Sequence, residues 1–200
     1  MPTLAQAEKP SYLGLLNAIS LGETDAGVYL RAWADATCDE DLACTLRFVA
    51  ARESSHGEVF LRRLNELGFE LRHKPDPGAE KRLAKVADPR IEDIDKLPSE
   101  REERGDPFAE IKAQLADGRY DAMTANLLTW YIAEEYDSGR RLREAYDCVR
   151  AKAGASGRLG KANGRAAMSP SADAEAIMAC MTAGFARLEK SLEKLAKAKK

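Results

Sequence analysis

The chain has 200 residues, of which 44% are hydrophobic and 32% are charged, and its formal net charge is −2. This length allows one domain with a buried core, and the near-balanced charge excludes a strong overall attraction to nucleic acid or to an acidic membrane surface. The sequence has neither a signal-peptide pattern nor a stretch typical of a membrane span. We therefore expect a cytoplasmic protein that binds neither nucleic acid nor membranes.

The composition favours helices. Aromatic residues make up only 6% of the chain, whereas stretches rich in Ala, Leu, Glu, Lys and Arg, which are good helix formers, recur along it. The cysteines lack C-x-x-C spacing, which argues against a zinc site and against a disulfide framework. We expect an all-α fold with small, buried or half-buried cysteines at Cys38, Cys44, Cys148 and Cys180.

Residues 11–70 predict a hairpin of two long antiparallel helices. The first helix ends near Thr37. The second spans about 40–67, with Asp39 as its N-cap and Gly68 as its terminator. Because the connection between them is very short, the two helices pack side by side.

The remainder of the chain predicts a second helix pair. Residues 71–118 are rich in proline, glycine and charge and form a long crossover with short helices. A third helix covers 119–153, a glycine-rich flexible linker covers 154–169, and a fourth helix covers 170–200. Residues 1–200 thus form a single domain, a four-helix bundle of two antiparallel pairs.

An acid and an imidazole interrupt the apolar stripe of the second helix. Glu53 and His56 fall into the series of apolar positions between Val49 and Phe60, at helical steps of three and four. Arg52 lies on the opposite side of this helix. The pattern therefore places Glu53 and His56 on the dry face and Arg52 on the wet one.

A second acid lies at the same height on the first helix. Glu23 interrupts its apolar stripe fifteen residues before Cys38, and Glu53 follows Cys38 by fifteen residues, so both lie about 22 Å from the turn. Glu23, Glu53 and His56 can therefore meet. Buried charges cost several kcal/mol each unless they are paired, so we expect either a metal ion or a hydrogen-bonded cluster with an inward arginine such as Arg141.

A glutamate on one helix and Glu-x-x-His on the next, both directed into a bundle, resemble the half-site of ferritin-like carboxylate di-iron proteins. Residues 11–70 look like the first hairpin of this superfamily, which includes rubrerythrins and encapsulated ferritins. The resemblance implies a ferritin-like bundle in which Glu23 and Glu53 are carboxylate ligands and His56 is a terminal nitrogen ligand.

The second half of the chain departs from this pattern. Glu135 lies on the apolar stripe of the third helix and is the candidate third carboxylate, with Ser138 where a ligand motif would have histidine. Glu134 shares its face with Asp137 and an arginine, which favours solvent. Tyr131, one turn before Glu135, is either a hydrogen-bonding or redox-active phenol or an ordinary core residue. The fourth helix lacks Glu-x-x-His, so one chain does not supply six standard ligands.

Three interpretations follow. In the first, Glu23, Glu53, His56 and Glu135 bind one or two ions of iron, or of manganese, and the protein handles iron or performs oxygen- or peroxide-linked redox chemistry as a non-haem iron oxidoreductase. In the second, two chains of a homodimer complete the site across a two-fold axis. In the third, the bundle is a degenerate, metal-free relative that serves as an interaction or scaffold protein.

Overall fold

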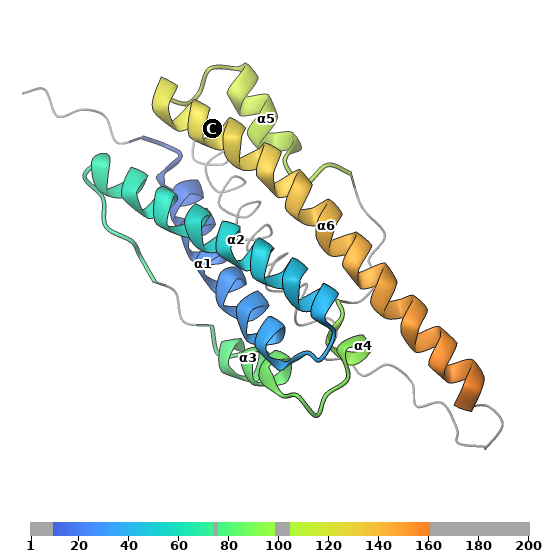
Figure 1. The fold of residues 1–200 in the computed structure, drawn as a ribbon. Helices are drawn as coiled ribbons and strands as arrows, with labels where there is room; N and C mark the ends of the chain where they lie inside the picture. The colour runs from blue at the N-terminus through green and yellow to red at the C-terminus, as the bar shows by residue number, and fades with distance from the viewer. Residues whose placement is uncertain (1–9, 74–75, 99–104, 161–200) are drawn as a thin grey trace, which may run out of the picture.

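The computed structural model describes residues 10–73, 76–98 and 105–160 (Figure 1). In these ranges the chain forms helices and no strand, which confirms the all-α prediction for the described part. The predicted fourth helix, 170–200, lies outside the described residues. In chain order the helices are α1 (Leu13–Ala36), α2 (Glu40–Glu66), α3 (Ala79–Ala87), α4 (Asp93–Lys96), α5 (Ala109–Ala116) and α6 (Ala122–Gly160).

The α1–α2 hairpin agrees closely with its prediction. The two helices lie side by side and antiparallel (Figure 1). Asp39 caps α2, because its side chain accepts a hydrogen bond from the backbone N–H of Leu42 at 3.3 Å. Gly68 follows α2 with φ of +80°, a left-handed conformation that ends helices and suits glycine.

Two glycines allow the backbones of α1 and α2 to approach closely. A Cβ on Gly57 would lie 3.0 Å from the backbone nitrogen of Thr24 and 3.2 Å from the carbonyl oxygen of Ser20. A Cβ on Gly27 would lie 3.1 Å from the carbonyl oxygen of Ala50. The Ser20 hydroxyl donates to the Gly57 carbonyl at 2.9 Å across this contact. The hairpin is thus fixed at the level where Glu23 and His56 must meet.

Helix α6 is anchored to the hairpin at its first turn. Asp121 accepts hydrogen bonds from the backbone N–H groups of Met123 at 3.0 Å and Thr124 at 3.1 Å, so it acts as the N-cap. The guanidinium of Arg63 donates to Asp121 at 2.8 Å and to the Thr124 hydroxyl at 3.0 Å. The Tyr12 hydroxyl also donates to Asp121, at 2.5 Å. These contacts join α6 to both helices of the hairpin.

Helix α6 is longer than predicted. It continues to Gly160, so the predicted flexible linker, 154–169, is wrong over 154–160. A single glycine costs a helix only about 1 kcal/mol relative to alanine, and Gly154 is flanked by alanines that favour the helix. Residues 161–169 of that prediction lie outside the described part of the chain.

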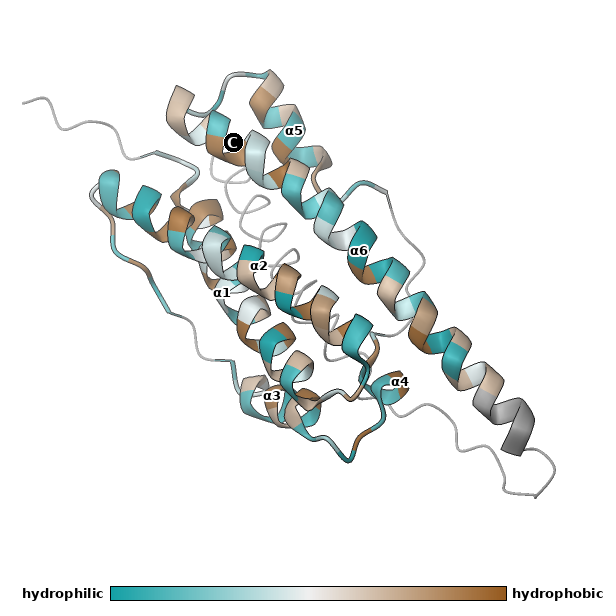
Figure 2. Ribbon diagram, in the orientation of Figure 1, coloured by the Kyte–Doolittle hydropathy of each residue, from teal (hydrophilic) through white to brown (hydrophobic). Residues whose placement is uncertain are grey.

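The core of the described residues consists of two apolar clusters along the bundle. Figure 2 shows hydrophobic and hydrophilic residues interspersed along α2 and α6. The Phe60 cluster includes Leu16, Ile19, Phe60, Leu64, Leu128 and Tyr131. The Trp33 cluster includes Leu30, Trp33, Leu46, Val49, Leu142 and Tyr146. On each long helix, the predicted site residues fall between the two clusters.

Two further expectations concern the surface. Cys38, Cys44 and Cys148 are exposed, so the prediction that they are buried or half-buried is wrong. Cys38 lies in the hairpin connection, and the other two lie off the apolar stripes of their helices; Cys180 is outside the described residues. No described helix offers a stretch apolar enough to cross a membrane.

Candidate metal centre

The structure brings together the four residues that the sequence singled out. Glu23, Glu53, His56 and Glu135 each offer one ligand atom, and these atoms all lie within 4.8 Å of one another. Helix α1 supplies the first, α2 the next two and α6 the last. That these residues bind a metal ion stays a prediction.

The cluster is withdrawn from solvent. His56 is 0%, Glu53 1% and Glu23 8% exposed, and the Glu135 side chain is 8% exposed. The apolar clusters on both sides leave little water to solvate these groups. Three carboxyl groups in such surroundings need a positive charge or bound protons.

Three carboxylates face one nitrogen of the His56 ring. His56 Nδ1 lies 3.3 Å from Glu135 Oε1 and 3.9 Å from one oxygen each of Glu23 and Glu53. The ring nitrogen and the three carboxylates therefore surround a common centre, from three different helices.

Several of these atoms have no hydrogen-bond partner. Among the described residues, His56 Nδ1, Glu53 Oε1 and Glu135 Oε1 are all buried without one. A buried polar atom without a partner typically costs about 1–3 kcal/mol. One cation at the common centre would lie between two of these atoms, His56 Nδ1 and Glu135 Oε1, and beside the Glu53 carboxylate. The donor set, three carboxylates and one imidazole, fits iron or manganese.

Two aromatic rings contact His56. The Tyr131 ring meets the imidazole edge-on at 5.1 Å, and its hydroxyl donates to Glu23 Oε1 at 2.7 Å. Tyr131 is therefore a hydrogen-bonding phenol and, at 1% exposed, also a residue of the apolar core, so it matches both of these predicted alternatives. The Trp130 ring makes a similar edge contact at 4.9 Å and remains 39% exposed. The site lies directly beneath this partly exposed indole.

The electrostatics favour bound protons when no ion is present. Burial, together with the neighbouring Glu23, raises the pKa of Glu53, and burial also raises the pKa of Glu23. Burial alone would lower the pKa of His56, but the nearby carboxylates of Glu135 and Glu134 outweigh this effect and raise that pKa. The cluster thus retains protons in place of the positive charge that an ion would bring.

The surroundings of the cluster differ from the sequence prediction. Glu134, predicted to face solvent, has Oε2 only 2.8 Å from His56 Nε2, and its side chain is 31% exposed. Arg52, predicted to lie on the wet face, donates to the Glu134 carbonyl oxygen at 3.2 Å and to Asp137 at 3.0 Å. The suggested inward cation, Arg141, instead donates to Asp137 at 2.7 Å and is not part of the cluster.

Ser138, at the position where a ligand motif would have histidine, is buried and accepts a hydrogen bond from Arg52 at 3.2 Å. Glu134 and Glu135, neighbours on α6, both face His56, one at each ring nitrogen. Two consecutive glutamates opposite a single inward histidine are the sequence signal that could have revealed this arrangement.

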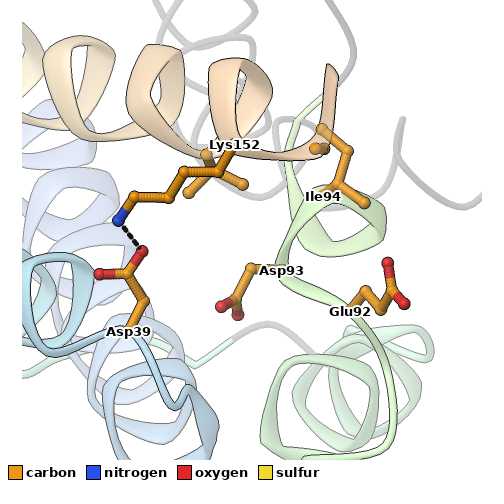
Figure 3. Close-up of a pocket in the computed structure, with 7 residues that line it drawn as sticks. Asp39, Glu92, Asp93, Ile94 and Lys152 are labelled. Carbon is orange, nitrogen blue, oxygen red and sulfur yellow. Dashed lines mark hydrogen bonds and ion pairs between the residues drawn. The ribbon is translucent and has the colours of Figure 1, made fainter. Parts of the chain in front are cut away.

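A pocket of about 200 Å³ lies elsewhere, where the hairpin connection meets α4 and α6 (Figure 3). It is lined by Asp39, Glu92, Asp93, Ile94, Val149, Lys152 and Ala153. Lys152 donates to Asp39, as Figure 3 shows, and Asp93 accepts hydrogen bonds from Trp33 and Thr37. Because these two carboxylates already have partners, the Glu/His cluster is the stronger candidate site.

Comparison of the chain with protein-family models, with curated proteins and with solved structures found no match.

Proposed function

We propose that the protein binds a divalent transition-metal ion, iron or manganese, through Glu23, Glu53, His56 and Glu135. The observation that carries this proposal is a buried cluster of four residues from three helices, in which ligand atoms of Glu53, His56 and Glu135 have no hydrogen-bond partner. The raised pKa values of Glu23 and Glu53 support it, because they express the same need for positive charge. Together with this metal site, we propose that the helices form a ferritin-like four-helix bundle.

The geometry favours one ion per chain. Oxygen and nitrogen ligands lie about 2.0–2.2 Å from Zn²⁺, and with similar distances to another divalent transition-metal ion, ligand atoms on its opposite sides are roughly 4.2 Å apart. The four ligand atoms lie within 4.8 Å of one another, so they would have to move only slightly closer together to bind one ion. Two-metal sites hold ions about 3.5–4 Å apart and need additional bridging and terminal ligands. A second ion would require ligands from beyond these four residues.

A bound ion would supply redox or Lewis-acid chemistry, which suits iron handling or a reaction with oxygen or peroxide. The protein's own residues determine the environment of that chemistry. The three carboxylates balance the charge of the ion, and the apolar clusters exclude water. The Tyr131 hydroxyl donates a hydrogen bond to Glu23 Oε1, and the other oxygen of this carboxylate, Oε2, faces His56.

Metal content tests the proposal directly. The protein is purified from cells supplemented with iron and manganese and is analysed for metals, beside the variants Glu53→Ala and Glu58→Ala. Glu58 is an exposed acid of α2 and serves as the matched control. We expect about one equivalent of metal in the wild type and in Glu58→Ala, and none in Glu53→Ala, which loses a ligand.

The stability of the variant completes this test. Metal-free Glu53→Ala should remain folded, because it removes an acid whose charge the core disfavours. If the wild type contains no metal above background, the proposal is overturned, and the metal-free scaffold is favoured. Equal metal in the wild type and in Glu53→Ala would place the bound ion elsewhere on the chain.

A further inference from the structure

The imidazole of His56 lies between two consecutive glutamates of α6. Glu134 Oε2 is 2.8 Å from Nε2, and Glu135 Oε1 is 3.3 Å from Nδ1. Only the Glu134 contact is a hydrogen bond, because Nδ1 has no such partner. The two ring nitrogens therefore have different surroundings. One is bonded to a half-exposed carboxylate, and the other faces the buried carboxylates.

We propose that Glu134 is a positioning residue, which fixes the His56 tautomer that directs the free electron pair of Nδ1 toward Glu23, Glu53 and Glu135. This inference rests on the proposed metal site. An ionised carboxylate can only accept hydrogen bonds, so Nε2 must carry the hydrogen. Neutral imidazole then has an unprotonated Nδ1, which is the form that binds a metal ion.

The other neighbours of Glu134 support this role. Arg52 is the nearby cation, but its Nε lies 3.8 Å from Glu134 Oε2, much farther than the 2.8 Å to His56. Arg52 makes its shorter contacts with the Glu134 carbonyl oxygen, Asp137 and Ser138. It therefore holds the backbone of α6 at Glu134, while the carboxylate itself is directed to the imidazole.

Loss of Glu134 would leave the ring free to choose the other tautomer. His56 Nδ1–H could then donate to Glu135 Oε1, which is already 3.3 Å away. A metal ion would have to break this bond and shift the proton before it could bind. Removing such an orienting partner typically weakens metal binding about 10–100-fold.

Metal affinity is the first readout. Mn²⁺ is titrated calorimetrically into metal-free wild type, Glu134→Leu, Glu134→Gln and Glu144→Leu. Glu144 is the control, because it lies on α6 with a 63% exposed side chain and pairs with Arg140. We expect binding to weaken about 10–100-fold in Glu134→Leu and less in Glu134→Gln, whose amide oxygen still accepts. Glu144→Leu should bind like the wild type.

The tautomer is the second readout and needs no metal. His56 and His73 are the only histidines, so ¹⁵N–¹H spectra of the metal-free protein contain two imidazoles, and the exposed His73 is the internal reference. At a pH where His56 is neutral, we expect the Nε2–H form in the wild type and a shift toward Nδ1–H in Glu134→Leu.

The outcomes separate the two proposals. Wild-type protein that binds no Mn²⁺ overturns the proposed function, whereas the spectra still test the bond to Glu134. Unchanged Mn²⁺ affinity in Glu134→Leu, or an Nδ1–H tautomer in the wild type, overturns the positioning role alone.

Discussion

Different kinds of residues form two helix interfaces of the molecule. One interface lies between α1 and α2, and the other lies between this pair and α6. Between α1 and α2, glycines and small hydroxyl side chains allow backbones to touch, as at Ser20 and Gly57. Between α2 and α6, charged groups meet in addition to the apolar side chains of the two clusters, as in the Arg52–Asp137 ion pair and the His56–Glu134 hydrogen bond.

This difference has a consequence for the candidate site. Close backbone packing is insensitive to protons and ions, so the hairpin holds Glu23, Glu53 and His56 in place by itself. Glu135 and Glu134 are supplied by α6, across an interface that contains charged pairs as well as apolar contacts. The hairpin thus supplies three of the four candidate ligands, and α6 supplies the fourth. The following predictions test this contrast.

The largest expected effect is that of pH on the metal-free protein. The carboxyl of Glu53 titrates near pH 4.3 in an unfolded chain, and its pKa is raised in the fold. Above that pH the unfolded chain releases a proton that the fold retains. The free energy of unfolding therefore falls as pH rises, by up to about 1.4 kcal/mol per pH unit for one proton.

His56 acts in the same direction. Its raised pKa contributes stability below about pH 6.5, the unfolded value, and this contribution is lost as pH rises through the folded pKa. Urea unfolding with a chelator, between about pH 5 and 8, measures the combined trend. Glu53→Gln, which mimics the protonated acid, should flatten it. Parallel profiles for the two proteins would show that Glu53 carries no retained proton.

A single added methyl group at the hairpin interface should destabilise the protein. In Gly57→Ala the new Cβ would lie 2.4 Å from the Thr24 hydroxyl and 3.0 Å from the Thr24 backbone nitrogen. Such overpacking costs about 1–3 kcal/mol. Thermal or urea unfolding of the metal-free protein would show this loss, and Mn²⁺ affinity should fall as well, because Glu53 and His56 move away from Glu23.

The matched control for Gly57→Ala is on α6. At Gly139 the nearest atom to an added Cβ is the end of the flexible Arg143 side chain, at 3.3 Å. Alanine favours a helix over glycine by up to about 1 kcal/mol, so Gly139→Ala should be neutral or stabilising. Equal losses in both variants would contradict the contrast between the interfaces.

The smallest expected effect is at the start of α6. Asp121→Ala removes the N-cap and the hydrogen-bond acceptor of Tyr12 and Arg63. Loss of an N-cap costs about 0.5–2 kcal/mol. Urea unfolding should report a loss in this range, whereas Mn²⁺ affinity should change little, because the change lies about three helical turns from Tyr131 and about four from Glu135. A loss of metal binding as large as that of Glu53→Ala would show that the capped end controls the site.

The sequence predicted the hairpin well, because a short connection fixes register. Once the turn is placed near Cys38, the fixed rise of a helix brings Glu23 and Glu53 to the same height. The apolar stripe of each helix then shows that the acid lies on the buried face. Glu135 was also found in this way, since it lies on the stripe of its own helix.

The orientation of α6 could not be predicted to the same precision. A crossover of more than fifty residues separates it from α2, so no turn fixes its register. Glu134 and Glu135 are neighbours about 100° apart on the helix, and a modest rotation decides whether the former meets solvent or His56. The role of Arg52 depends on the same rotation, because its partners are Asp137, Ser138 and the Glu134 carbonyl.

The separation of partners along the chain also bears on the order of folding. The hydrogen bond from Ser20 to Gly57 spans 37 residues, whereas the bond from Tyr131 to Glu23 spans 108. Contacts between residues that are distant in the sequence form more slowly, because the chain must lose the entropy of a larger loop before the contact stabilises it. The hairpin is therefore expected to assemble first, with its acids still hydrated and ionised, and to lose that water only when α6 docks.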